Sequence, residues 1–226
     1  MEWHGIWVLN LEPINVNTAD MPVQSLSKKI KFLFISFGLL LFILTFSLTL
    51  IAYNGYFYRA EFEKLQIYEV YDDADLRLDN LLSYLRYQED LSPEYYSRRD
   101  IRHMEDVRNL LSLNVAIMLL SFFLIIKHAR LLKKSFLPLG IVAGVFLLLS
   151  LAALSGFSEL FLLFHKLAFT NDFWLLNPLQ DTLINLFPEQ FFLDALRSAM
   201  WICFGLLSIY ALFLSYIRFI NRNRKR

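Results

Sequence analysis

Four long runs of apolar residues alternate with more polar stretches along the chain, and each run predicts a membrane-spanning helix. The runs cover residues 30–53, 110–126, 136–154 and 199–217. Each is long enough, since about 20 apolar helical residues cross the hydrocarbon core of a bilayer. We therefore expect an all-α integral membrane protein in which residues 26–226 form one domain of four transmembrane helices. Residues 1–25 form a leader of uncertain status, and Met21 is an alternative start.

Basic residues collect before the first run, between the second and third runs, and after the fourth run. These three places hold more than half of the 22 Lys and Arg residues. Because basic residues are retained on the cytoplasmic side, both chain ends are expected in the cytoplasm. The long connections at residues 54–109 and 155–198 then face outward.

The first outward connection contains two helical patterns. Within residues 75–88, four leucines share one face of a short amphipathic helix: Leu78, Leu81, Leu82 and Leu85. Further on, Ser97 and Asp100 have the spacing of a capping box. A helix is therefore expected to begin there and to continue into the second span.

The second outward connection is too apolar for water and too polar for lipid. Prolines and carboxylates interrupt residues 164–192, so this stretch is expected at the membrane surface. Ser158 is expected to cap a helix that carries His165, and Asn177 to cap a short helix through Leu186. Pro188 is expected to begin the helix that continues into the fourth span.

Composition agrees with a membrane protein and excludes some chemistry. The chain is 57% hydrophobic, with a mean hydropathy of +0.44 and 22 phenylalanines. Its net charge is +1, and no nucleic-acid partner is expected. The single cysteine, Cys203, excludes an intramolecular disulfide and a cysteine-based metal cluster.

Two of the four histidines, His103 and His165, are expected on the outward side near the bilayer surface. Histidine titrates closest to neutrality, so it is the natural proton carrier at this level. Carboxylates at helical spacing can orient these rings: Asp100 or Asp106 beside His103, and Asp172 or Glu159 beside His165. A single interfacial histidine is more often an anchor, but two on one face of the membrane favour acid–base chemistry.

Other chemistries have less support in the sequence. The chain lacks the G-x-S-x-G, Walker and H-E-x-x-H motifs. The spacing of the histidines and aspartates is not diagnostic of zinc, so no metal and no cofactor are expected. Asp181 and Glu189 are expected to cap helices. Without an obvious serine or cysteine nucleophile, the substrate is expected to supply its own nucleophile.

Three motifs resemble a bacterial family of four-span membrane proteins that includes the lipoprotein intramolecular transacylase. They are HMEDV at 103–107, the pair Phe164-His165, and NDxWLLxPxxDxLIxLFPExFF at 171–192. The resemblance implies an enzyme that moves the sn-2 acyl chain of a diacylglyceryl-cysteine lipoprotein onto the α-amine of the same cysteine. The product is a lyso-form lipoprotein, and membrane lipids surround the enzyme. Asn177 stands where many relatives have an acid, which indicates a cap.

The resemblance also implies roles for residues. The two functional histidines of the family correspond to His103 and His165. We expect His165 to take a proton from the cysteine amine and His103, held by Asp106, to polarise the ester and protonate the departing glyceryl oxygen. No covalent acyl-enzyme is expected. Asn171 is expected to bind the oxyanion. A groove for acyl chains is expected along Phe161, Leu162, Phe169 and Trp174.

Two other functions fit the same pattern. One is a non-catalytic outer-face protein that binds lipoproteins or lipids, such as a chaperone or an envelope sensor. The other is a metal-dependent lipid hydrolase, which would release free fatty acid. Activity that depends on both histidines distinguishes the transacylase from the first of these.

Overall fold

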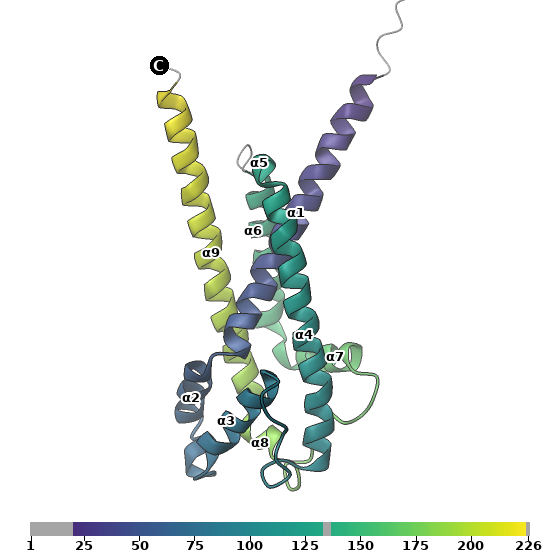
Figure 1. Cartoon of the computed structure of the whole chain (residues 1–226), viewed down its shortest axis with the longest axis vertical. Helices are drawn as coiled ribbons and strands as arrows, with labels where there is room; N and C mark the ends of the chain where they lie inside the picture. Colours follow the sequence, from purple (N-terminus) through teal and green to yellow (C-terminus); the bar gives the residue numbers. More distant parts are fainter. Residues whose placement is uncertain (1–19, 133–136, 225–226) are drawn as a thin grey trace, which may run out of the picture.

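The computed structural model describes residues 20–132 and 137–224, and every element in this part of the chain is helical (Figure 1). In chain order these are α1 (Asp20–Ala52), α2 (Gly55–Lys64), the 3-10 helix η1 (Ile67–Glu69), α3 (Ala74–Leu85), α4 (Arg98–Lys127), α5 (Ala129–Leu132), α6 (Leu137–Ser155), α7 (Phe157–Ala168), α8 (Leu183–Leu186) and α9 (Glu189–Asn223). The predicted all-α class is confirmed. Most of the predicted leader, residues 1–19, lies outside the described residues.

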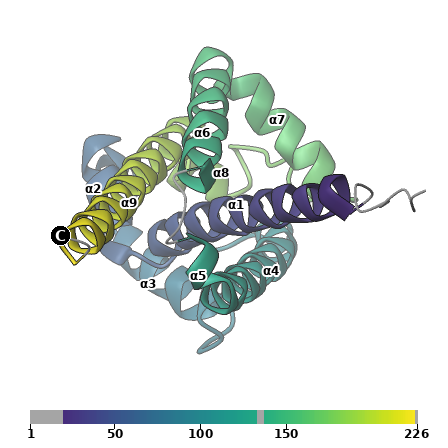
Figure 2. The same ribbon diagram turned by 90° about the horizontal axis from the view of Figure 1, so that it is seen from above.

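A bundle of long helices forms the apolar part of the molecule. Three stretches are long and apolar enough to cross a membrane: Ile30–Ala52, Arg98–Lys127 and Glu189–Asn223. A shorter apolar stretch, Leu139–Leu148, lies within the 19-residue helix α6. Helix α1 packs against α4, α6 and α9 and so lies at the centre of the bundle (Figure 2).

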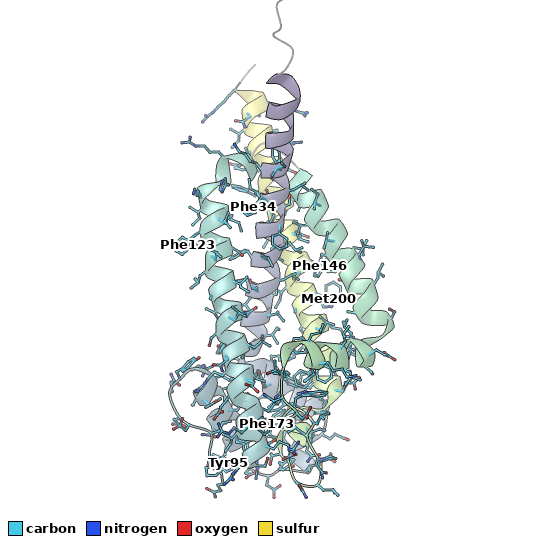
Figure 3. The ribbon with its side chains drawn as sticks, turned by 90° about the vertical axis from the view of Figure 1, so that its right-hand side faces the viewer. Phe34, Tyr95, Phe123, Phe146, Phe173 and Met200 are labelled. Carbon is cyan, nitrogen blue, oxygen red and sulfur yellow. The ribbon has the colours of Figure 1, made fainter. Side chains whose placement is uncertain are left out.

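Large apolar side chains face outward along this bundle. Phe34 on α1 and Phe123 on α4 are 61% and 64% exposed (Figure 3). Phe146 on α6 is buried against Cys203 and other residues of α1 and α9. Such an apolar outer surface is costly in water and favourable in lipid, so the bundle is a membrane domain.

Several polar groups inside the bundle have hydrogen-bond partners on a neighbouring helix. Asn114 on α4 donates through Nδ2 to the carbonyl oxygen of Thr45, at 3.1 Å, and to Oγ1 of Thr49, at 2.8 Å. Oγ of Ser47 lies 3.2 Å from Sγ of Cys203 on α9. Hydrogen bonds of this kind join helices where lipid offers no alternative partner.

The predicted helix starts at Ser97 and Pro188 are confirmed. Ser97 accepts a hydrogen bond from the N–H of Asp100, whose carboxylate accepts from the N–H of Ser97, both at 3.0 Å. This reciprocal pair satisfies two N–H groups that the first turn of α4 leaves free. Pro188 precedes α9, which continues without interruption into its apolar part.

Helices α2, α3 and α8 form a second layer at one end of the bundle (Figure 1). The predicted leucine stripe is confirmed, because all four of its leucines are buried in α3. Phe62 of α2 and Leu186 of α8 are fully buried beside them. The described chain ends and α5 lie at the opposite end of the molecule, so the described basic residues next to them, among them Arg130 on α5 and Arg222 near the end of α9, share one end (Figure 1).

A buried carboxylate, Asp194, fastens α2 to the start of α9. It accepts hydrogen bonds from Lys64 at 2.6 Å, from Gln190 at 2.8 Å and from Arg197 at 2.9 Å. Burial alone would raise the pKa of Asp194, but these donors outweigh it and lower the pKa to about 2. The carboxylate is therefore ionised at neutral pH and holds the two helices together.

Two predictions for the second connection were wrong. Gly156, not Ser158, precedes α7, and Ser158 donates its hydroxyl to the carboxylate of Glu189 on α9. The side chain of Asn177 accepts from the N–H of Leu179, but the helix that follows covers only Leu183–Leu186. Asp181 is the reason, since it accepts from the N–H of Asn177 and holds the segment between them in a turn.

Candidate active site

The two histidines that the sequence predicts on the outward side meet where the second layer joins the bundle. His103 lies on α4 and His165 on α7, and their ring centroids are 6.1 Å apart with an angle of 33° between the planes. His103 lies seven residues before Leu110, where the apolar part of α4 begins. The pair predicted from sequence is therefore in contact distance in the folded chain.

His103 is almost fully buried. Its side chain is 9% exposed, and the ring edge of Phe169 packs on it with centroids 5.1 Å apart. Burial, together with the nearby charge of His165, lowers the pKa of His103 to about 4, although Asp106 opposes the shift. Nδ1 of His103 is buried without a hydrogen-bond partner. The ring is thus neutral at neutral pH.

The tautomer of His165 follows from its hydrogen bond. Nδ1 lies 2.8 Å from the carbonyl oxygen of Phe161, one turn earlier on α7. A carbonyl oxygen only accepts, so Nδ1 carries the hydrogen and the lone pair of the neutral ring is on Nε2. The rings of Phe161 and Trp174 flank His165, at centroid distances of 4.4 and 5.3 Å. His165 is therefore prepared to accept a proton at Nε2.

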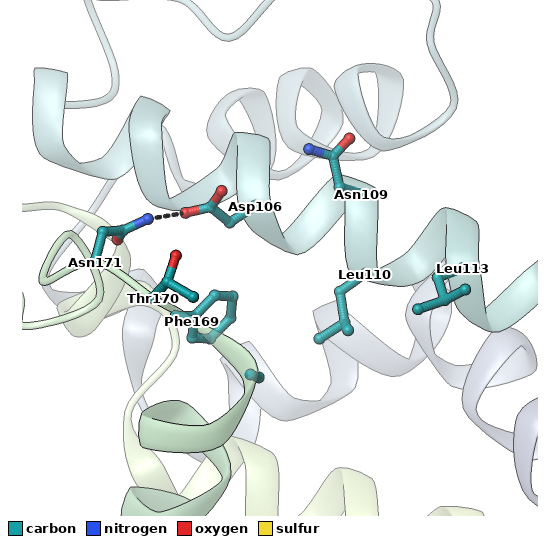
Figure 4. Close-up of a pocket in the computed structure, with 8 residues that line it drawn as sticks. Asp106, Asn109, Leu110, Leu113, Phe169, Thr170 and Asn171 are labelled. Atoms are coloured by element: carbon teal, nitrogen blue, oxygen red, sulfur yellow. Dashed lines mark hydrogen bonds between the residues drawn. The ribbon is translucent and has the colours of Figure 1, made fainter.

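Asp106 and Asn171 connect α4 to the segment that follows α7 (Figure 4). Nδ2 of Asn171 donates to Oδ2 of Asp106 at 2.8 Å, and Oδ1 of Asn171 accepts from the N–H of Phe173 at 3.0 Å. The second bond fixes the orientation of the amide. Asn171 therefore presents its donor to Asp106 and keeps the carboxylate one helical turn from His103.

A pocket of about 260 Å³ lies beside this connection (Figure 4). Four polar and four apolar residues line it: Asp106, Asn109, Thr170 and Asn171, and Leu110, Leu113, Ala168 and Phe169. Phe169 contacts both histidines and also lines the pocket, so the pocket adjoins the histidine pair. Such a site can take a group with one polar end and one apolar end.

Sequence reasoning missed several pocket residues, although a signal for some of them was present. His103, Asp106, Leu110 and Leu113 follow one another at steps of three and four residues, so they form one stripe along α4. Following the face of α4 that carries His103 toward its C-terminal end would have identified Leu110 and Leu113. Ala168 and Thr170 lie next to Phe169, but no periodicity marks them.

Asp100 contacts the backbone of the second connection, residues 155–198. Asp100 is fully buried and accepts from the N–H groups of Thr182 and Leu183, at 2.8 and 3.3 Å. Burial raises the pKa of Asp100, and these backbone donors oppose the rise. Asp181 accepts from the hydroxyl of Ser97 at 2.6 Å. These bonds join the first outer segment to the second, one turn above His103.

Other predicted site residues lie further from the histidines. Asp172 is exposed, and its backbone oxygen accepts from the guanidinium of Arg99 at 3.2 Å. Leu162 is 44% exposed on α7, whereas Phe161 also packs on Phe192 of α9, with centroids 4.9 Å apart. Of the four residues expected along an acyl groove, only Phe169 lines the pocket.

Metal-ligating side chains do not gather at this site. Among the described residues, no group of three or more His, Cys, Asp or Glu side chains is arranged to hold an ion. The chemistry that the residues themselves offer is proton transfer between a neutral, buried imidazole and a second imidazole with a free Nε2.

Fold and site together define a helical membrane protein with a histidine pair at one end of its apolar bundle. Residues 33–192 match the family model of the lipoprotein intramolecular transacylase Lit. The chain therefore belongs to this family, which is a family of acyltransferases. A search of curated protein sequences found no match.

Solved structures with the same fold come from Bacillus cereus. The membrane-integral lipoprotein intramolecular transacylase of that organism is 24% identical, with a TM-score of 0.76 over 90% of this chain and all of the other. A variant of it with one histidine changed to arginine is also 24% identical, with a TM-score of 0.77 over 90% of this chain and 97% of the other. The likeness establishes a shared membrane fold.

Proposed function

We propose that this protein converts a diacylglyceryl-cysteine lipoprotein to its lyso form by moving the sn-2 acyl chain to the α-amine of the same cysteine. The observation that carries the proposal is the contact between His103 and His165, with ring centroids 6.1 Å apart. Membership of the transacylase family supplies the substrate class. The amine belongs to the substrate, so the enzyme needs no nucleophile of its own.

His165 acts as the general base in this proposal. Its Nδ1–H is donated to the carbonyl of Phe161, which leaves Nε2 to take a proton from the cysteine amine. As the amine nitrogen bonds to the ester carbonyl carbon, the bond to the sn-2 glyceryl oxygen breaks. The proton then passes from His165 to that oxygen, which leaves as a hydroxyl. The sequence assigned this step to His103, but a neutral His103 carries no additional proton to give. Atoms and charge balance without a covalent acyl-enzyme.

His103 polarises the ester. Its pKa of about 4 keeps the imidazole neutral, and a neutral imidazole donates a hydrogen bond to a developing oxyanion without first losing a proton. The charge of Asp106 favours the protonated form of His103, so burial has to outweigh it to keep the ring neutral. Asn171 orients Asp106 and is the second candidate donor to the oxyanion.

Proximity supplies a large part of the rate. Amine and ester belong to one substrate molecule, and well-oriented intramolecular reactions gain roughly 7–11 kcal/mol. Phe161, Leu162, Phe169 and Trp174 hold the acyl chains, and the exposed apolar face of α7 rests in the membrane surface. The full arrangement has four spans, with both chain ends in the cytoplasm and the histidines at the outer leaflet.

The test measures lyso-form lipoprotein by mass spectrometry of the N-terminal lipopeptide. His103→Ala and His165→Ala are each expected to lose at least 100-fold in rate, since general acid–base groups contribute about that much. His128→Ala is the matched control. Nδ1 of His128 also contacts a carbonyl oxygen one turn earlier, Leu124 at 3.0 Å, but this residue ends α4 at the opposite end of the molecule.

Lyso product from either variant at the rate of His128→Ala would remove that histidine from the mechanism. Wild-type protein that binds the lipoprotein but yields no lyso product would be the non-catalytic binder instead. Free fatty acid, with activity lost on chelation, would identify a metal-dependent hydrolase.

A further inference from the structure

Arg108 lies on α4 two residues before Leu110, and its guanidinium group packs on two tyrosine rings. Cζ of Arg108 is 4.0 Å from the ring centroid of Tyr84 and 4.6 Å from that of Tyr87. The hydroxyl of Tyr87 lies 2.7 Å from Oγ of Ser112, one turn further along α4. We call Arg108, Tyr84 and Tyr87 the arginine bracket. Helix α4 holds Arg108 and helix α3 holds Tyr84, whereas Tyr87 lies in the turn that follows α3.

The bracket contains polar atoms without partners. Nε of Arg108 and the hydroxyl oxygen of Tyr84 are buried, and neither makes a hydrogen bond. Tyr84 as a whole is 3% exposed. Within residues 20–132 and 137–224, no acceptor or carboxylate is bound to the guanidinium of Arg108. A partly buried cation with free donors is costly unless an anion reaches it.

The nearest acid on α4 is already engaged. Glu105 accepts from Nη1 of Arg102 at 2.8 Å, so it pairs with another arginine. A second cation, Arg86, follows α3 and donates to the carbonyl oxygen of Tyr53 at 3.0 Å, where α1 ends. Burial raises the pKa of Tyr84, and so do the charges of Glu105 and Asp90, which Arg108 opposes. The bracket and its surroundings therefore hold Arg86, Arg102 and Arg108 against two acids and keep a net positive charge.

The position of the bracket along α4 indicates which kind of anion can reach it. Arg108 lies only about 3 Å above the start of the apolar part of α4, at 1.5 Å per residue. Phosphate groups of lipid headgroups lie at this level, just outside the hydrocarbon core. Arginine matches phosphate well, because its planar fork of N–H donors can bind two oxygens at once.

We propose that the arginine bracket binds the phosphate group of a membrane phospholipid. The diacylglyceryl group of a lipoprotein carries no phosphate, so this lipid is not the substrate. Arg108 and Asp106 are two residues apart, which places them about 200° apart around α4. The phospholipid site is therefore on the opposite side of α4 from the pocket, and it fixes the helix in the headgroup layer.

The experiment titrates the purified full chain with lipids and counts bound molecules by native mass spectrometry. The probes are phosphatidylglycerol, a diacylglycerol with the same chains, and inorganic phosphate. Wild-type protein is expected to bind one phosphatidylglycerol at least tenfold more tightly than diacylglycerol. Arg108→Gln is expected to lose roughly tenfold in that affinity, as the loss of a charged hydrogen bond implies.

Arg98→Gln is the matched control, since it removes the same charge from an exposed position on the same helix, leaves the Arg102–Glu105 pair intact and should leave the affinity unchanged. Tyr84→Phe keeps the ring and tests the unpartnered hydroxyl, with a smaller loss expected. If Arg108→Gln does not fold, Arg108→Lys replaces it in the test. This variant keeps the charge and should retain part of the binding.

Equal affinity of wild type for phosphatidylglycerol and diacylglycerol would overturn the proposal. Equal loss in Arg98→Gln and Arg108→Gln would do the same, because charge alone would then explain binding. Inorganic phosphate that binds as tightly as phosphatidylglycerol would assign the site to a soluble anion and reject the lipid.

Discussion

Asn171 donates to Asp106 across 2.8 Å, and this bond joins the segment after α7 to the helix that carries His103. It is one of the contacts that set how closely α7, with His165, approaches α4. The same amide accepts from the N–H of Phe173, so it cannot turn without breaking a second bond. The position of one catalytic candidate thus depends on a residue outside its own helix.

Asn171→Ala should lower the rate of lyso-lipoprotein formation about tenfold and the free energy of unfolding by about 1 kcal/mol, the value of a typical hydrogen bond. Rates come from lipopeptide mass spectrometry and stabilities from thermal unfolding in detergent. Asn109→Ala, which alters the same pocket without breaking that bond, is the control. Similar rates for the two variants would show that the Asn171–Asp106 bond has no part in catalysis.

The low pKa of His103 makes stability depend on pH. Its folded value of about 4 lies below the unfolded value near 6.5, so acid protonates the unfolded chain first. The free energy of unfolding should therefore be unaffected by His103 above pH 6.5 and should fall by about 3 kcal/mol as pH decreases from 6.5 to 4. In His103→Gln this loss should be absent, and unfolding curves across that range measure the difference.

Asp100 should contribute strongly to stability. Asp100→Ala leaves the buried N–H groups of Thr182 and Leu183 without their acceptor, and each such loss costs about 1–3 kcal/mol. Hydrogen exchange should accelerate at those two amides in particular. Asp72→Ala, at an exposed position, serves for comparison and should change little. Unchanged exchange at Thr182 would show that Asp100 does not hold the second segment.

Asp194→Asn should weaken the attachment of α2 to α9. The carboxylate is buried, whereas Lys64 and Arg197 are about half exposed and can turn to water, so a loss of about 1–2 kcal/mol is expected. A double-mutant cycle with Lys64→Met isolates the pair, and a coupling near zero would contradict the interpretation. The pKa of about 2 implies that this contribution is complete above pH 4 and is lost as pH falls toward 2.

Local patterns predicted much of the fold. The helix start at Ser97 and the buried leucines of α3 follow from spacing within a few residues, so they could be read from sequence alone. Helix α2 was missed because only Tyr58 and Phe62 mark its buried face, a pattern too short to stand out. The histidine pair came from the predicted topology and from the family motifs, since no local rule says that α4 and α7 meet.

Partners across the fold were harder to predict. The spacing along α4 places Asp100 and Asp106 equally close to His103, yet one binds the backbone of Thr182 and the other binds Asn171. The choice depends on where the second connection lies, which only the packed structure specifies. Ser158 was misassigned for the same reason, because its acceptor lies on α9.

Helix α4 runs without a break from Arg98 to Lys127, so it carries His103 at one end and a transmembrane stretch at the other. When a continuous helix tilts, the side chains at its end, here the His103 imidazole, move with it. Because helices tilt as bilayers become thinner, the height of the imidazole above the lipid would follow membrane thickness. The lipid composition of the membrane would then set the depth at which the imidazole can meet a substrate ester.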